Sequence, residues 1–164
     1  NAMYTVGQKI VHPMHGAGTV VEVLEKTVLG ETKDYYKIQM MLRGIEILVP
    51  VDRCEAIGLR NVMTEDEYKE LIEVLDGKMS KMPKNWNQRY RANMERIKTG
   101  DILELGSVVR NLMLLDANKG LSAGEKRMLI GAKQMMISEM MILTGETMEA
   151  EEAFVDAHVL NSES

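Results

Sequence analysis

The residues best suited to bind a charged ligand are concentrated in one segment, residues 78–98. Seven Lys or Arg residues and one Glu lie there, a local net charge of +6 in a chain whose net charge is −5. The only tryptophan, Trp86, lies within this segment. An aromatic ring among cations can stack on an unpaired base or wedge between base pairs while the cations hold the phosphate backbone. The segment is therefore a candidate nucleic-acid interface.

The same pattern has a purely structural interpretation. A run of cations is commonly a solvated helix face. Trp86 precedes Tyr90 by four residues, so the ring could also extend an apolar helix stripe of Tyr90, Met94 and Ile97. The neighbouring Asn and Gln residues, in place of aliphatic ones, favour exposure of the ring instead. Both interpretations stay open at the level of these residues.

A second candidate anion site lies at residues 122–127. Ser122 and Glu125 have the spacing of a capping box, which predicts the start of a helix. The free N–H groups at a helix N-terminus favour an anion such as phosphate. Lys126 and Arg127 follow directly. We expect Ser122 and Glu125 to cap the helix and the two cations to remain free to contact DNA.

No set of residues has the types and spacing of a catalytic centre. His12 and His15 lack an evident third metal ligand, so a turn between strands is expected there. Cys54 is expected to be a small buried residue and not a nucleophile. The sequence therefore predicts a protein that is not an enzyme and that holds no metal or other cofactor.

Composition narrows the class of protein further. The chain has 164 residues, 45% of them hydrophobic, and its 15 Met but few aromatic residues predict a core of aliphatic and thioether groups. The single cysteine excludes an internal disulfide. No apolar run reaches the roughly 18 residues that a membrane span needs. Residues 1–2, before Met3, resemble an expression-tag remnant, and no signal peptide is recognised, so a cytoplasmic protein is expected.

The residue pattern changes near position 60, which predicts two domains. The first part is rich in β-branched residues, with strands expected at 20–24, 35–40 and 45–49, and close spacing of short strands favours a small barrel or bent sheet. In the second part apolar residues recur at helical spacing between capping signals and glycines. Helices are expected to begin at Thr64, Asn85, Asp101 and Ser122, with a short fifth helix near the C-terminus. The expected fold class is α+β, with a β module followed by an all-α bundle of about five helices.

Three stretches resemble the CarD/CdnL family of bacterial transcription regulators, whose N-terminal module is shared with the transcription-repair coupling factor. They are residues 6–18 (VGQKIVHPMHGAG), residues 85–93 (NWNQRYRAN) and residues 120–129 (GLSAGEKRML). The first stretch alone indicates only the shared module, whereas the second and third together are specific to the CarD-like group. They occur in family order, so the resemblance extends over nearly the whole chain.

The resemblance implies a Tudor-like, SH3-type RNA polymerase interaction domain at residues 3–60 and a helical DNA-binding domain at residues 61–164. In such proteins the first domain docks on the β subunit of RNA polymerase by adding a strand edge. The second domain reaches the upstream edge of the transcription bubble, where a tryptophan acts as a wedge. The positions implied to contact DNA are Trp86, Arg89, Arg91, Lys126 and Arg127. Those expected to face polymerase are Lys26, Arg43, Ile47, Leu48 and Val49. Leu48 stands where some members have Arg, and Arg43 is the nearby residue that could replace it.

The resemblance implies a transcription regulator that stabilises the open promoter complex and binds as a monomer, without a membrane partner. Low sequence specificity is expected, because phosphate contacts and stacking do not distinguish base edges. The alternative is an interaction adaptor that binds polymerase through the β module and another protein through a Met-rich helical face. In that alternative Trp86 is a core residue.

Overall fold

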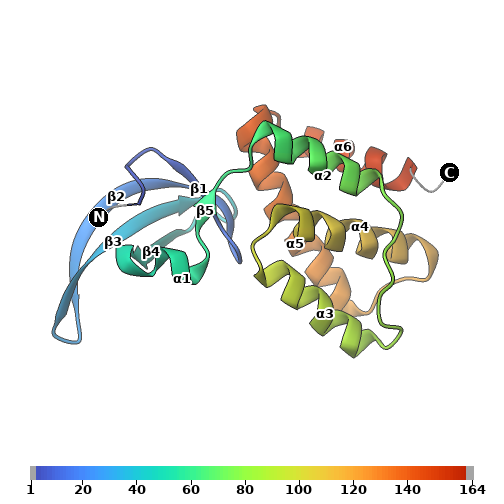
Figure 1. The fold of residues 1–164 in the computed structure, drawn as a ribbon, viewed down its shortest axis with the longest axis horizontal. Coiled ribbons are helices and arrows are strands. Elements are labelled where there is room, and N and C mark those ends of the chain that lie inside the picture. The colour runs from blue at the N-terminus through green and yellow to red at the C-terminus, as the bar shows by residue number, and fades with distance from the viewer. Residues whose placement is uncertain (1–2, 162–164) are drawn as a thin grey trace.

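The computed structural model describes residues 3–161, so the expected tag remnant at residues 1–2 lies outside the described part. An N-terminal sheet and a C-terminal helical bundle form two lobes placed end to end (Figure 1). The α+β fold class, with a β part followed by helices, is confirmed. None of the helices described is long and apolar enough to span a membrane.

The N-terminal lobe is a five-stranded antiparallel sheet with the strand order β4-β3-β2-β1-β5. The strands are β1 (Lys9–His12), β2 (Gly16–Val28), β3 (Glu31–Met40), β4 (Glu46–Pro50) and β5 (Arg60–Asn61). A 3₁₀ turn (Val51–Arg53) and the short helix α1 (Cys54–Ile57) connect β4 to β5. The three predicted strands lie in β2, β3 and β4. β1 and β5 were not predicted, because strands of four and two residues contain too few positions to show a period of two.

The sheet bends around a small apolar core. A register shift between Val20 and Glu22 in the pairing of β2 with β3 marks a β-bulge, which increases the local twist. Val20 and Tyr36 are buried beneath the bend, and the Tyr36 hydroxyl accepts a hydrogen bond from the Tyr4 N–H at 2.9 Å. Cys54 is buried in the same core, as expected.

The C-terminal lobe contains five helices, the number expected from the sequence. They are α2 (Glu65–Asp76), α3 (Trp86–Lys98), α4 (Ile102–Asn118), α5 (Ala123–Thr144) and α6 (Met148–Asn161). α4 lies at the centre, with α2 and α6 on one side and α3 on the other (Figure 1). The four predicted N-caps are confirmed, since the side chains of Thr64, Asn85, Asp101 and Ser122 each accept a first-turn N–H.

The methionines of α5 contribute to the core of the helical lobe. Met128, Met136 and Met140 are buried in one apolar cluster with residues of α2, α4 and α6. Flexible thioether side chains can fill irregular gaps where aromatic residues are scarce. The Met-rich face that the adaptor hypothesis requires is therefore largely covered by the other helices.

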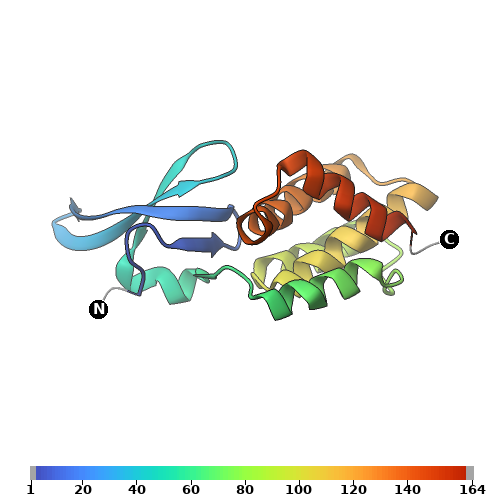
Figure 2. The ribbon, with the colours of Figure 1, turned by 90° about the horizontal axis from the view of Figure 1, so that it is seen from above.

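The two lobes meet where α5 approaches the beginning of β2 (Figure 2). Gly16, the first residue of β2, has a positive φ of 80°, and a Cβ there would lie 2.8 Å from the Ser138 Oγ and 3.3 Å from the Met135 Cα. Glycine is therefore required for the strand to come this close to the helix backbone. The neighbouring Ala17 N–H donates a hydrogen bond to the Ser138 Oγ at 3.1 Å.

Candidate nucleic-acid interface

Trp86 is the first residue of α3 and half of its surface is exposed. Asn85 caps this helix, and its Oδ1 accepts hydrogen bonds from the N–H groups of Asn87 at 3.0 Å and Gln88 at 3.1 Å. Such a cap satisfies N–H groups that the first turn of a helix leaves without partners. The cap thereby fixes where the helix starts and holds the ring at the end of the bundle, outside its core.

The ring of Trp86 borders a groove of about 690 Å³ between the N-terminal turns of α3 and α5. The groove is lined by Trp86, Asn87, Tyr90, Ser122, Ala123, Gly124, Arg127 and Met128. Two of the positions expected to contact DNA, Trp86 and Arg127, thus lie on one concave surface although they are 41 positions apart in the chain. Tyr90 packs against the core as part of the expected apolar stripe, and it also lines this groove. Its helical spacing predicts the first placement but does not indicate the second.

Arg89 has a role inside the protein. Its guanidinium forms a bidentate ion pair with the completely buried carboxylate of Glu125, with Nε–Oε2 at 2.6 Å and Nη2–Oε1 at 2.8 Å. Its Nη1 also donates to the carbonyl oxygens of Pro83 and Lys84, just before Trp86. The Arg89 side chain is only 13% exposed. The structure therefore places Arg89 as a connection between α5 and the residues that precede α3.

The Arg89–Glu125 contact changes the acidity of both groups. Hydrogen bonding to Arg89 lowers the pKa of Glu125, against the effect of burial, and hydrogen bonding to Glu125 raises the pKa of Arg89. The carboxylate oxygen Oε1 also accepts from the Ser122 N–H and Oγ, which completes the predicted capping box. Glu125 thus occupies the N-terminus of α5, where the sequence had indicated a place for an external anion.

The remaining cations expected to contact DNA are Arg91, Lys126 and Arg127, and all three are exposed. Arg91 lies on α3, five residues after Trp86, and Lys126 and Arg127 lie in the first turns of α5. Within residues 3–161, no ion pair involves any of these three side chains. Of the three, Arg127 lines the groove that Trp86 borders.

The residues expected to face polymerase do not form one patch. β4 is the edge strand of the sheet, and among the strands described only β3 pairs with it. Leu48 points outward and is 38% exposed, Val49 is buried in the sheet core and Ile47 is half-buried. Lys26 is exposed on β2, separated from β4 by β3. A strand edge that offers backbone N–H and C=O groups is therefore present, with Leu48 as its most exposed apolar side chain.

Arg43 lies in the turn between β3 and β4, on the side that faces the helices. Together with His15 and Arg127 it lines an apolar cleft of about 260 Å³ between the two lobes. The sequence had grouped Arg43 with Leu48 because they are close in the chain. The structure instead brings Arg43 to the same cleft as Arg127, a proximity that depends on how the lobes are packed.

The His12–His15 pair forms a turn between β1 and β2, as expected. Burial, followed by the proximity of His15, lowers the pKa of His12 to about 4, and its Nδ1 accepts the Met14 N–H at 3.0 Å. In residues 3–161 no group of three or more His, Cys, Asp or Glu side chains is arranged to hold a metal ion.

Comparison with known proteins gives matches to both lobes. Residues 4–63 match the CarD-like/TRCF RID domain, and residues 70–156 match the CarD C-terminal domain. The chain is 36% identical over 145 residues to "Putative transcription factor YdeB" of Bacillus subtilis strain 168, covering 88% of this chain and 95% of that protein. A solved structure, CdnLNt from Myxococcus xanthus, is 26% identical and covers 40% of this chain and 92% of its own, with a TM-score of 0.33.

The two domain matches follow the order of the lobes, and the Bacillus relative spans nearly the whole chain. The three stretches that resemble the CarD/CdnL group lie in β1–β2, at the start of α3 and at the start of α5. This chain therefore belongs to the CarD-like family of transcription regulators.

Proposed function

We propose that this protein docks on the β subunit of RNA polymerase through residues 3–60 and stabilises the open promoter complex through residues 61–164. In this proposal Trp86 acts as a wedge at the upstream edge of the transcription bubble. Arg91, Lys126 and Arg127 bind the DNA backbone beside it. The protein requires no catalytic step, because contacts made only with melted DNA are sufficient to shift the population toward the open state.

The half-exposed ring of Trp86 is the single observation that carries this proposal. A large aromatic side chain gains free energy from burial, so exposure at the end of a folded helix leaves it available to a partner. The Asn85 cap and the Arg89–Glu125 ion pair hold the backbone on both sides of this helix start. A ring on a backbone that is already held loses less conformational entropy on stacking than a ring on a mobile segment.

The expected size of the effect follows from the small number of contacts. Stacking of one base on an aromatic side chain contributes about 1–3 kcal/mol. A coupling of that size changes the ratio of open to closed complexes by roughly 5- to 150-fold. The neighbouring cations add affinity that decreases with salt, without a preference for sequence.

Docking through β4 provides the local concentration that such weak DNA contacts require. The outer edge of β4 can accept a strand from polymerase by main-chain hydrogen bonding, with Leu48 adding an apolar contact. Arg43 and Lys26 lie away from this edge. We therefore propose that Leu48 and the backbone of β4, more than these two cations, carry the polymerase contact.

The proposal is tested by the lifetime of open complexes on a promoter, formed with bacterial RNA polymerase and challenged with a competitor. The wild-type chain is expected to prolong the lifetime, and Trp86→Ala is expected to lose most of that effect. Ile130→Ala is the matched control, because Ile130 is an exposed apolar residue on α5 outside the groove. Equal prolongation by Trp86→Ala and wild type would refute the wedge.

A polymerase-binding measurement separates the two halves of the proposal. Leu48→Glu is expected to weaken binding to the β subunit, whereas Trp86→Ala leaves it unchanged. If Trp86→Ala weakened polymerase binding as much as Leu48→Glu, the helical lobe would be a protein-binding surface, as the adaptor hypothesis requires.

A further inference from the structure

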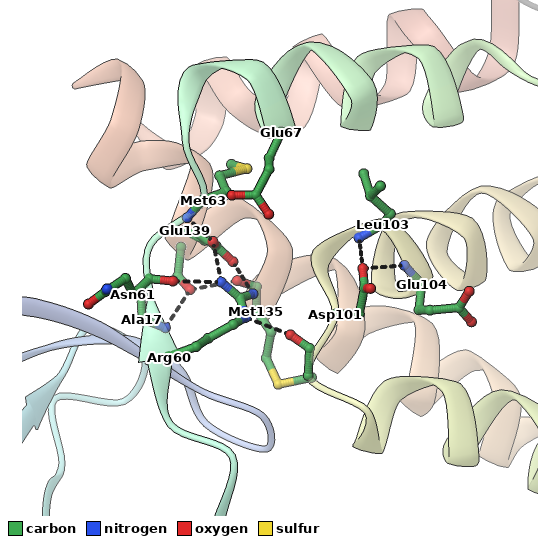
Figure 3. Close-up of polar contacts among 12 residues, drawn as sticks. Ala17, Arg60, Asn61, Met63, Glu67, Asp101, Leu103, Glu104, Met135 and Glu139 are labelled. Carbon is green, nitrogen blue, oxygen red and sulfur yellow. Dashed lines mark hydrogen bonds and ion pairs between the residues drawn. The ribbon is translucent and has the colours of Figure 1, made fainter. Parts of the chain in front are cut away.

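Several of the polar contacts between the two lobes are made by one buried carboxylate, that of Glu139 on α5 (Figure 3). Its side chain is only 1% exposed. Oε1 accepts a hydrogen bond from Arg60 Nη2 and Oε2 from Arg60 Nη1, both at 2.7 Å. Oε2 also accepts the backbone N–H of Met63 at 2.7 Å. Arg60 belongs to β5, so this ion pair joins the sheet to the helical bundle.

Glu139 binds the connection between the lobes at two points. β5 ends at Asn61 and Thr64 caps α2, so Val62 and Met63 form the whole link. The Arg60 side chain and the Met63 N–H are held on either side of Val62 by the same carboxylate. A link this short would be the natural hinge between the lobes if nothing held it.

Arg60 also contacts a second part of the helical lobe. Its Nε donates to the carbonyl oxygen of Gly100, in the turn between α3 and α4, at 2.6 Å. The guanidinium therefore connects β5 with α5 and with the end of α3, the helix that begins at Trp86. Planar, bidentate hydrogen bonding fixes orientation as well as distance, because both N–H groups must align with both oxygens.

Opening the interface would break the hydrogen bonds that the Glu139 carboxylate accepts from Arg60 and Met63. Among the residues that the structure describes, Arg60 and Met63 are the donors of hydrogen bonds to the Glu139 carboxylate. Removing the Arg60 guanidinium while the interface stays closed would leave the carboxylate buried without its partner, which is strongly disfavoured. The close approach of Gly16 to Ser138 adds a second, uncharged contact at the same interface.

We propose that Arg60 and Glu139 are positioning residues that hold the two lobes in one orientation and so set the place of Trp86 relative to the β4 edge. This inference rests on the proposed function, in which one lobe docks on polymerase and the other reaches the DNA. A wedge on a freely rotating lobe would sample many positions, and only a fraction of them would meet the bubble edge. The population of productive complexes would fall by that fraction.

The orientation of the lobes is measured directly in the full chain. Nitroxide labels at Glu31→Cys in the sheet and Lys119→Cys in the bundle, both exposed positions, are placed in a Cys54→Ala background, and their distance distribution is recorded by pulsed electron resonance. The labelled chain that keeps Arg60 and Glu139 is expected to give a single narrow distance distribution. The same labelled chain with Glu139→Gln or with Arg60→Met is expected to give a broad one. The double variant Arg60→Met with Glu139→Leu removes both charges. It tests whether loss of the ion pair broadens the distance distribution when no unpaired carboxylate is left buried.

The functional readout uses the same variants without labels. We expect their prolongation of open complexes to fall by about fivefold, while affinity for polymerase stays within about twofold of wild type. Glu104→Gln is the matched control, because Arg96 and Glu104 form a 2.7 Å ion pair between α3 and α4 inside one lobe. That control is expected to keep both the narrow distribution and the full effect.

Two results would overturn the inference. One is an unchanged narrow distribution in both the Glu139→Gln and the double variant. The other is a broadened distribution together with a full effect on open complexes. If the wild-type chain itself failed to prolong open complexes, the proposed function would be refuted, and the distance distributions alone would then decide whether the ion pair holds the lobes.

Discussion

Replacing Arg89 with Met should destabilise the protein in a way that depends on pH. The substitution preserves much of the side-chain volume but leaves the carboxylate of Glu125 buried without its bidentate partner. Breaking a buried ion pair by removing one member costs about 3–5 kcal/mol. For a chain that unfolds in one transition, this corresponds to a loss of about 6–20 °C in melting temperature near pH 7.

The pH dependence identifies the buried charge as the cause. In wild type the pKa of Glu125 lies below its ordinary value of 4.5, so the contribution of the ion pair is complete above pH 4.5 and is lost only as the pH falls through the folded-state pKa. Without Arg89, burial raises the pKa of Glu125 above that of the unfolded chain. The penalty is then present at neutral pH and is relieved by protonation as the pH falls toward 4.5. The gap in melting temperature between wild type and Arg89→Met should therefore shrink on acidification.

Thermal unfolding followed by circular dichroism between pH 7.5 and pH 4.5 measures this gap. The double variant Arg89→Met with Glu125→Gln leaves no unpaired buried charge at this site, so we expect it to be more stable than Arg89→Met alone at pH 7 and to lack the pH effect. A double variant as unstable as the single one, or a gap that does not change with pH, would refute the electrostatic explanation and indicate lost packing instead.

Three further predictions follow from other parts of the structure. Gly16→Ala should lower the melting temperature and broaden the distribution of distances between the lobes. Its Cβ would lie 2.8 Å from the Ser138 Oγ, and the residue has a positive φ that alanine rarely adopts. A fully stable variant would contradict this. Arg91→Gln and Lys126→Gln should each weaken the salt dependence of binding to fork DNA. If each cation binds one phosphate, the slope of the logarithm of the binding constant against the logarithm of the salt concentration should decrease in magnitude by about 0.9. An unchanged slope would exclude that contact. The Cys54 thiol is buried and its pKa is raised by burial, so a thiol reagent should react with it only at the rate of unfolding; rapid labelling of the native protein would argue against this packing.

The helical lobe was predictable because its signals are local. Thr64, Asn85, Asp101 and Ser122 each cap the helix that follows within three residues, and the spacing of apolar residues marks the buried faces. Capping and periodicity depend on neighbours in the chain, so they can be recognised without tertiary contacts. The longer strands were predictable for the same reason, whereas the two-residue strand β5 is a strand through its pairing with β1, which is distant in the chain.

The candidate interface was only partly predictable. The sequence identified Trp86 and the cations but left open whether the ring is buried in the core. It also gave Arg89 the same expected role as Arg91, because a guanidinium 36 residues from its carboxylate partner carries no local sign of that pairing. The structure separates them: Arg91 is exposed, and Arg89 binds the buried carboxylate of Glu125.

Residue types and spacing by themselves determined the order of the two lobes, the helix starts and the charge around Trp86, because these depend on interactions over a few residues. Only the tertiary structure decided that Trp86 lies half-exposed beside Arg127, that Arg43 faces the cleft between the lobes and that Glu139 binds the link at Arg60 and Met63. Each of these depends on how α5 packs against elements far away in the chain. Burial and pairing across such distances are set by the sum of many weak contacts, which no single segment contains.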